Sequence, residues 1–91
     1  QPLGGQRAEV DRAVAVGMAD GPAVALELVD ALSDEPALRD FHLVPAVRAD
    51  LLLRLGRNAL ARQEFERAAA LATNGREQTL LLRRAAEAAE P

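Results

Sequence analysis

The feature of this sequence that most constrains its fold is a series of apolar-periodic segments, each stopped by a short turn. Apolar residues recur at spacings of three and four within the segments, which is the period of one face of an α-helix. The turns at residues 20–22, 56–57 and 73–75 contain glycine or proline and are only a few residues long. Helices joined by such short turns lie beside each other and run antiparallel. The pattern therefore predicts an all-α fold built from antiparallel helix pairs.

The periodicity predicts five helices and one shorter helical turn, and no competing strand pattern is present. We expect Gly21 to end the first helix and Pro22 to take the first position of the second. Pro36 should open only a single turn, through Arg39, and Asn58 is a candidate N-cap for the fourth helix. The expected helices are residues 7–19, 22–32, 43–55, 58–72 and 76–89.

Aromatic residues make up only 2% of the chain, so the core has to be built from Leu, Val and Ala. Side chains of this size favour close packing of helix on helix. Phe65 is the aromatic residue expected to be buried, between the third, fourth and fifth helices. The other residues expected to face the core share the helical spacing: Val10, Ala13, Val14, Gly17, Val24, Ala25, Leu28, Val29, Leu32, Leu60, Ala61, Ala68 and Leu71.

Composition excludes several classes of protein. The formal net charge is −3, whereas nucleic-acid binding rests on a concentrated positive field, so nucleic acid is not an expected direct partner. The chain has no Cys and no apolar run long enough to cross a bilayer, and its first residues do not resemble a signal peptide. We expect a cytoplasmic protein whose residues 1–6 are disordered or foreign to the natural sequence, with the folded domain at 7–91.

No catalytic constellation is present in the sequence. His42 is the only histidine and Ser33 the only serine, so neither a histidine pair for a metal nor a nucleophile with its base is available. We therefore expect no enzyme activity, no metal site and no cofactor. Two interpretations of His42 stay open: a pH switch, or a hydrogen-bonded structural residue at the start of the third helix.

The chain also repeats itself at an offset of 36 residues, which places Ala25 on Ala61 and Val29 on Phe65. The second copy resembles the tetratricopeptide repeat (TPR), although Arg48 stands where that family has Leu. The resemblance implies two TPR-like repeats followed by a C-terminal capping helix. Two repeats are fewer than an independent solenoid usually needs. A generic helical bundle is the alternative fold.

A more specific resemblance covers about residues 10–89 and is carried by residues 11–23 and 41–52. The first segment is similar to the Asn-Arg-Ala-Val-Ala run and Asp-Gly-Pro-Ala turn in the C-terminal extension of a group of bacterial extracytoplasmic-function (ECF) sigma factors, with Asp11 in place of Asn. The second resembles the Tyr-His-Leu-Leu-Pro-Ala segment of the same extension. The resemblance implies a regulatory module that contacts other regions of its parent sigma factor or RNA polymerase. The chain lacks the sigma regions that bind promoter and polymerase.

Two candidate contact surfaces follow. In a TPR pair the first helix lines a groove, and an apolar groove suits an amphipathic helix. That helix could belong to a partner or simply to the parent chain. The second surface is the turn between the first two helices, which could instead serve only as a helix boundary. The candidate residues are Val10, Val14, Met18, Leu43, Leu53 and Arg54 in the groove, and Asp20, Gly21, Pro22 and Ala23 in the turn.

Two other functions stay open besides the sigma-factor module. One is a free-standing TPR adaptor unrelated to transcription. The other is an accessory domain of an enzyme whose catalytic residues lie outside this chain. We also expect the isolated fragment to form a homodimer, because the first helix has no capping element before it.

Overall fold

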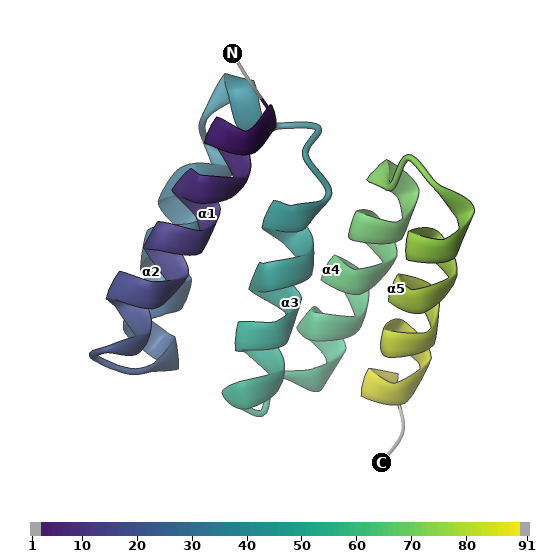
Figure 1. Ribbon diagram of the computed structural model, residues 1–91. Helices are drawn as coiled ribbons and strands as arrows, with labels where there is room; N and C mark the ends of the chain where they lie inside the picture. Colours follow the sequence, from purple (N-terminus) through teal and green to yellow (C-terminus); the bar gives the residue numbers. More distant parts are fainter. Residues whose placement is uncertain (1–2, 90–91) are drawn as a thin grey trace.

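The computed structural model describes residues 3–89, which form five α-helices and one 3-10 turn and contain no strand (Figure 1). This confirms the all-α prediction. Each α-helix packs against the next one in the chain, and α1, α3 and α5 run in the same direction. The result is a flattened layer, 37 × 32 × 18 Å in extent. The elements are α1 (Leu3–Met18), α2 (Pro22–Ser33), η1 (Pro36–Leu38), α3 (Leu43–Arg54), α4 (Asn58–Leu71) and α5 (Gly75–Ala89).

The first helix begins at Leu3, about one turn earlier than Arg7, where the sequence placed its start. Residues 3–6 therefore belong to the beginning of α1. One contact ties this turn to the rest of the domain, because Gln6 Nε2 donates a hydrogen bond to the Ala37 carbonyl oxygen at 2.7 Å. Residues 1 and 2 lie outside the described residues.

Two glycines end helices as expected. Gly21 has φ 110° and ψ 167°, a conformation that only glycine adopts readily, and Pro22 begins α2 immediately after it. After α3, Gly56 has φ 77°. Its N–H bonds the Leu53 carbonyl at 2.9 Å, and the Arg57 N–H bonds the Leu52 carbonyl at 2.9 Å. This pair of bonds is the Schellman arrangement, which satisfies the last carbonyls of the helix.

The prediction that Asn58 caps α4 is wrong. Asn58 is already the first residue of the helix, and Arg57 holds the capping position without a side-chain hydrogen bond. The side-chain cap occurs at α5 instead, where Asn74 Oδ1 accepts a hydrogen bond from the Glu77 N–H at 2.8 Å. An Asn one residue before a helix and an Asn at its first position look alike in sequence, so only the backbone geometry separates them.

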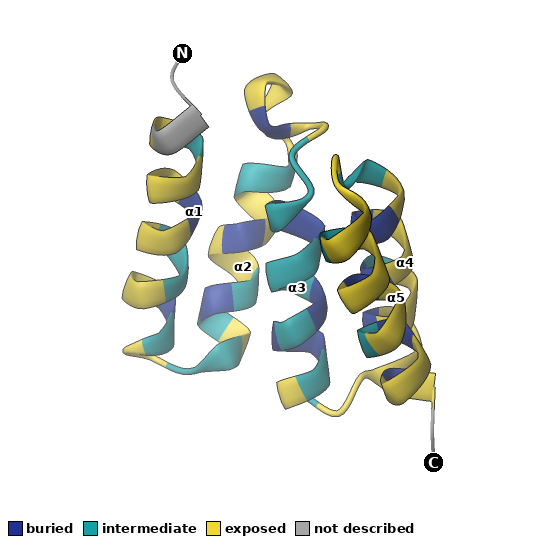
Figure 2. Ribbon diagram, turned by 45° about the vertical axis from the view of Figure 1, so that its right-hand side comes forward, coloured by how far each residue is buried: buried dark blue, intermediate teal, exposed yellow. Residues whose placement is uncertain are grey.

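The core consists of two clusters that meet on α3 (Figure 2). The first is centred on Phe65, which is only 2% exposed and lies among buried residues of α3, α4 and α5, as predicted. The second cluster is formed by Val10, Ala25, Val29, Leu38, Val44 and Leu51. Because α3 contributes Leu52 to the first cluster and Leu51 to the second, it is the element that joins the two halves.

Leu60 departs from the predicted apolar face of α4, because 45% of its surface is exposed. The buried stripe of this helix runs through Ala61, Phe65, Ala68 and Ala69. Successive residues of an α-helix are turned by about 100°. Leu60 therefore points to the side of that stripe, where no neighbouring helix covers it fully.

Candidate interaction surface

A groove lies between α1 and α3, which contact each other directly. It has a volume of about 210 Å³. We call it the α1–α3 groove and define it by its lining residues: Val14, Met18, Ala46, Val47, Asp50, Leu51 and Arg54. Three of the residues predicted for the groove, Val14, Met18 and Arg54, are brought together here. Because α2 runs antiparallel to both α1 and α3, the C-terminal ends of α1 and α3 lie on the same side of the molecule.

The other three predicted groove residues do not line it. Val10 is completely buried in the second core cluster, where α2 covers it, so it cannot touch a partner. Leu43 is half-buried against the same cluster. Leu53 packs against the first cluster, around Phe65. A helical period identifies residues on one face, but it does not show how far a neighbouring helix overlaps that face.

The charged residues at the edge of the groove neutralise one another. Arg54 Nε donates a hydrogen bond to Asp50 Oδ2 at 3.5 Å, one helical turn away. Arg84 Nη2 of α5 reaches the other carboxylate oxygen of Asp50 at 3.1 Å. The guanidinium of Arg84 also lies 4.8 Å from the centre of the Phe65 ring. With Asp50 paired with Arg54 and Arg84, the groove keeps an apolar floor and a rim whose charges are balanced.

The predicted turn at residues 20–23 adjoins the groove, because Met18 belongs to the groove and ends α1. Backbone bonds close the turn: Gly21 N–H donates to the Met18 carbonyl at 3.2 Å, and Ala25 N–H to the Gly21 carbonyl at 3.1 Å. Asp20 and Ala23 are exposed. Within residues 3–89 the Asp20 carboxylate has no hydrogen bond or ion pair, and α2 has no side-chain cap. The turn therefore forms without any contribution from the Asp20 side chain.

His42 lies at the start of α3 and is hydrogen-bonded, as its structural interpretation requires. Its Nε2 atom is 2.5 Å from Glu77 Oε1 in the first turn of α5. The ring also meets the ring of Phe41 edge-on, with their centres 5.5 Å apart. The pair connects the beginnings of α3 and α5, two helices separated by the whole of α4.

Arg48 has a role that the sequence did not reveal. Its Nε atom donates to Asp30 Oδ1 of α2 at 2.6 Å, and its Nη1 atom lies 3.0 Å from Glu64 Oε1 of α4. Burial alone would lower the pKa of Arg48, but the hydrogen bonds and charges of Asp30 and Glu64 outweigh it and raise that pKa. The signal in the sequence is a charged residue at a position where TPRs place Leu, but the sequence alone does not show which residues it pairs with.

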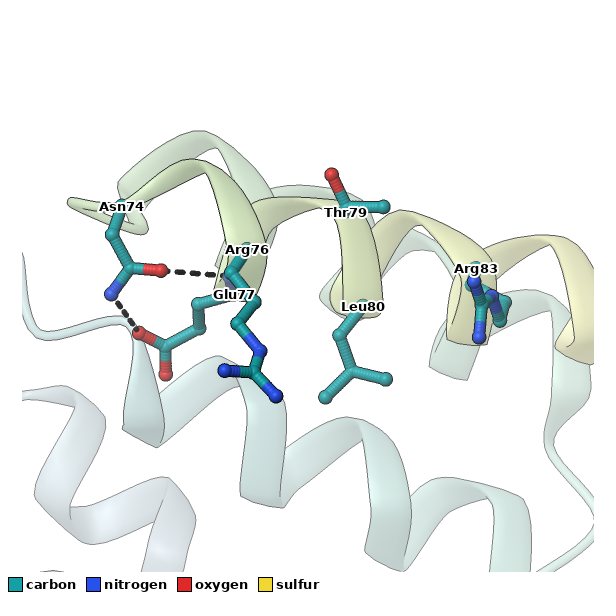
Figure 3. Close-up of a pocket in the computed structure, with 6 residues that line it drawn as sticks. All are labelled: Asn74, Arg76, Glu77, Thr79, Leu80 and Arg83. Atoms are coloured by element: carbon teal, nitrogen blue, oxygen red, sulfur yellow. Dashed lines mark hydrogen bonds between the residues drawn. The ribbon is translucent and has the colours of Figure 1, made fainter.

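A second depression, with a volume of about 650 Å³, lies along α5 (Figure 3). None of its lining residues was predicted as a site: Asn74, Arg76, Glu77, Thr79, Leu80 and Arg83. Asn74 engages Glu77 twice, through the cap and through a 3.4 Å bond from Nδ2 to Glu77 Oε2.

Two further properties concern residues 3–89 as a whole. In this part of the chain no three His, Asp or Glu side chains lie close enough together to hold a metal ion. None of the helices described above combines the length and the apolar character that a membrane span requires.

Comparison with known proteins gives one relative. No protein-family model matches the chain, and no solved structure matches it. An uncharacterized protein of Rhizobium meliloti (strain 1021) is 43% identical over 68 residues, which make up 75% of this chain and 16% of the relative. The chain thus spans about one sixth of the length of the relative it matches. A closely similar segment therefore occurs inside a much longer protein.

Proposed function

We propose that this chain is a protein–protein interaction module, the C-terminal domain of an ECF-type RNA polymerase sigma factor that regulates transcription initiation. Its α1–α3 groove would contact other regions of the parent sigma factor or RNA polymerase. The observation that carries this proposal is the groove itself. It has an apolar floor of Val14, Met18 and Ala46, and Asp50, its one acidic group, is already paired with arginines.

We further propose that the helices form two TPR-like repeats capped by α5. Sequential packing of antiparallel helices, with α1, α3 and α5 running the same way, supports this arrangement. Equivalent positions also have equivalent environments. Ala25 and Ala61 are both fully buried. Val29 is fully buried as well, and only 2% of the surface of Phe65 is exposed. Small residues recur where two helices of a pair cross, and larger ones where the pair meets its neighbour.

The sigma-factor assignment is supported by where the resembling segments lie. Residues 11–23 form the second half of α1, the turn and the start of α2, and residues 41–52 form most of α3. These are the segments that build the groove and its adjoining turn. The longer relative supports the idea that the chain works as part of a larger protein, since the matched region is 16% of that relative.

Substitution of Met18 by Gln in the full-length parent tests the groove. Gln is close to Met in size but ends in a polar amide, so the groove loses apolar contact and transcription by the parent with RNA polymerase should change several-fold. Val16→Gln is the matched control, because Val16 lies on the same helix but is 58% exposed and outside the groove. Equal transcription by the Met18 variant, the Val16 variant and the unchanged protein would rule out the groove as the contact surface.

Substitution of Asp20 by Asn tests the turn separately. Because the Asp20 side chain forms no hydrogen bond or ion pair within the described residues, the melting temperature of the domain should not change. If the carboxylate pairs with an arginine of the partner, the same change removes a charge-assisted contact and transcription by the parent falls. Unchanged transcription would leave the turn as a helix boundary only.

A free-standing TPR adaptor and an enzyme accessory domain are the alternatives. The coding sequence upstream of Gln1 separates all three. Sigma regions support the proposal, a start codon supports the adaptor, and a catalytic domain supports the accessory role.

A further inference from the structure

One face of α5 carries an exposed leucine between two arginines. Arg76, Leu80 and Arg83 are spaced by four and three residues, so they lie on the same side of the helix. Figure 3 shows Arg76 and Leu80 projecting from the same side of α5, while Thr79 points away. Leu80 is 54% exposed, which is a large fraction for a leucine beside a well-packed core. We call these three residues the α5 strip.

The arginines of the α5 strip are not neutralised within the domain. Neither Arg76 nor Arg83 forms an ion pair with any of residues 3–89, whereas neighbouring Arg84 pairs with Asp50 at 3.1 Å. The one carboxylate at the same depression, Glu77, is engaged by His42 and Asn74. The strip therefore keeps a local positive charge on a chain whose net charge is −3.

We propose that the α5 strip docks an acidic amphipathic helix. An apolar side chain of that helix covers Leu80, and a carboxylate on each side of it reaches Arg76 and Arg83. At a rise of about 1.5 Å per residue the two arginines are about 10 Å apart along α5, so the partner's carboxylates should also be seven residues apart. The proposal rests on the proposed function as an interaction module, but it uses a different surface from the α1–α3 groove and names the chemistry of the partner.

The charge pattern favours an acidic helix over the other occupants. A nucleic acid would need a broader positive field than two arginines on an acidic chain. A second copy of this chain would have to offer an apolar residue flanked by free carboxylates at this spacing. On α2 the exposed leucine is Leu28, and Glu27 lies beside it. Asp30 of the same helix is already paired with Arg48, so α2 does not offer two free carboxylates around its leucine.

The experiment measures binding of a synthetic helical peptide to the 91-residue chain by fluorescence anisotropy at low salt. The peptide carries Glu, Leu and Glu at the spacing of the strip, and a control peptide carries Gln in place of Glu. We expect saturable binding of the acidic peptide only. The double variant Arg76→Gln/Arg83→Gln should bind about fivefold more weakly, since it loses two exposed ion pairs. Leu80→Gln should bind about tenfold more weakly, because it loses buried apolar area.

The matched control is the double variant Arg12→Gln/Arg39→Gln. It removes the same charge from two exposed arginines that also lack an ion pair within residues 3–89, and it should leave binding unchanged. All four residues involved in charge removal are exposed, so circular dichroism melting should show an intact fold in both double variants.

Three outcomes would overturn the inference: no binding of the acidic peptide, equal binding of the Gln peptide, or equal loss of binding in both double variants. Tighter binding of single-stranded DNA than of the peptide, lost in the Arg76/Arg83 variant, would overturn it in favour of a nucleic-acid site. Failure of the α5 strip can be distinguished from failure of the proposed function. If Met18→Gln alters transcription while the peptide fails to bind, only the α5 strip is refuted.

Discussion

At the scale of single residues, Phe65 provides the largest side chain of the core, and its removal should be costly. Phe65→Ala leaves a cavity among α3, α4 and α5, so we expect a loss of roughly 3–5 kcal/mol in the free energy of unfolding. Leu60→Ala on the same helix is the control and should cost far less, because Leu60 is 45% exposed. Thermal or urea denaturation measures both. Similar small losses for the two variants would mean that Phe65 does not organise the core.

Gly17 allows the closest approach between two helices. A Cβ atom at this position would lie 2.3 Å from Ala25 Cα and 2.7 Å from Ala25 Cβ, and backbone cannot move aside as a flexible side chain can. Gly17→Ala should therefore destabilise the domain by about 1–3 kcal/mol, even though Ala favours helix more than Gly does. Gly75→Ala is the control, since a Cβ there meets nothing within 4 Å. A melting temperature raised by Gly17→Ala would contradict the observed contact between α1 and α2.

At the scale of helices, α3 joins the two core clusters and is also tied to its neighbours by Arg48. Replacing Arg48 by Met would remove the closer of the two arginines that pair with Glu64 and leave only Arg67, 3.7 Å from Oε2, an oxygen that is buried without a hydrogen bond. We expect Arg48→Met to cost about 1–3 kcal/mol, less than a fully buried pair would, because Arg48 is 29% exposed. In the double variant with Glu64→Gln part of that loss should be recovered. A double-mutant cycle by urea denaturation measures this coupling, and strictly additive losses would contradict it.

The raised pKa of Arg48 determines how this residue contributes to the stability of the domain at different pH values. A cation whose folded pKa lies above its unfolded value stabilises the fold at every pH below the unfolded value, and the contribution is lost only as pH rises through the folded pKa. Since the ordinary pKa of Arg already lies far above neutral and that of Arg48 is raised further, deprotonation of Arg48 does not affect the domain in the neutral or mildly alkaline range.

At the scale of the whole molecule, the two ends of the helical layer differ. Within residues 5–18 of α1, Val10 is buried, Val14 and Met18 are partly buried and Val16 is 58% exposed, whereas α5 exposes Leu82 at 50%. The homodimer expected from the sequence stays a prediction. The exposed residues favour weak self-association with α5 of one molecule against α1 of another, which is a head-to-tail contact. Sedimentation at micromolar concentration measures this association. Leu82→Gln should reduce it and Leu28→Gln on α2 should not; a monomer at all concentrations would refute it.

How much of the candidate site could be predicted from the sequence depended on how far apart its residues lie along the chain. The turn at residues 20–23 and the helices around it follow from local chemistry, and Met18, Val14 and Arg54 were assigned to one face correctly. The burial of Val10 could not be predicted from the sequence, because it depends on α2 packing over that part of α1. The α5 strip was missed because an exposed leucine in a leucine-rich run looks like a core residue until the buried neighbour, Leu81, is identified.

The sequence by itself determined the elements of this protein: five helices, the turns at Gly21 and Gly56, and the burial of Phe65. These features depend on helical period and on backbone conformations that glycine and proline control locally. Only the tertiary structure decided which charges meet. Arg48 pairs with residues of two other helices, and His42 meets Glu77 across 35 positions of the chain. The physical reason is that such contacts depend on the rotation and offset of packed helices, which a period along one segment does not specify.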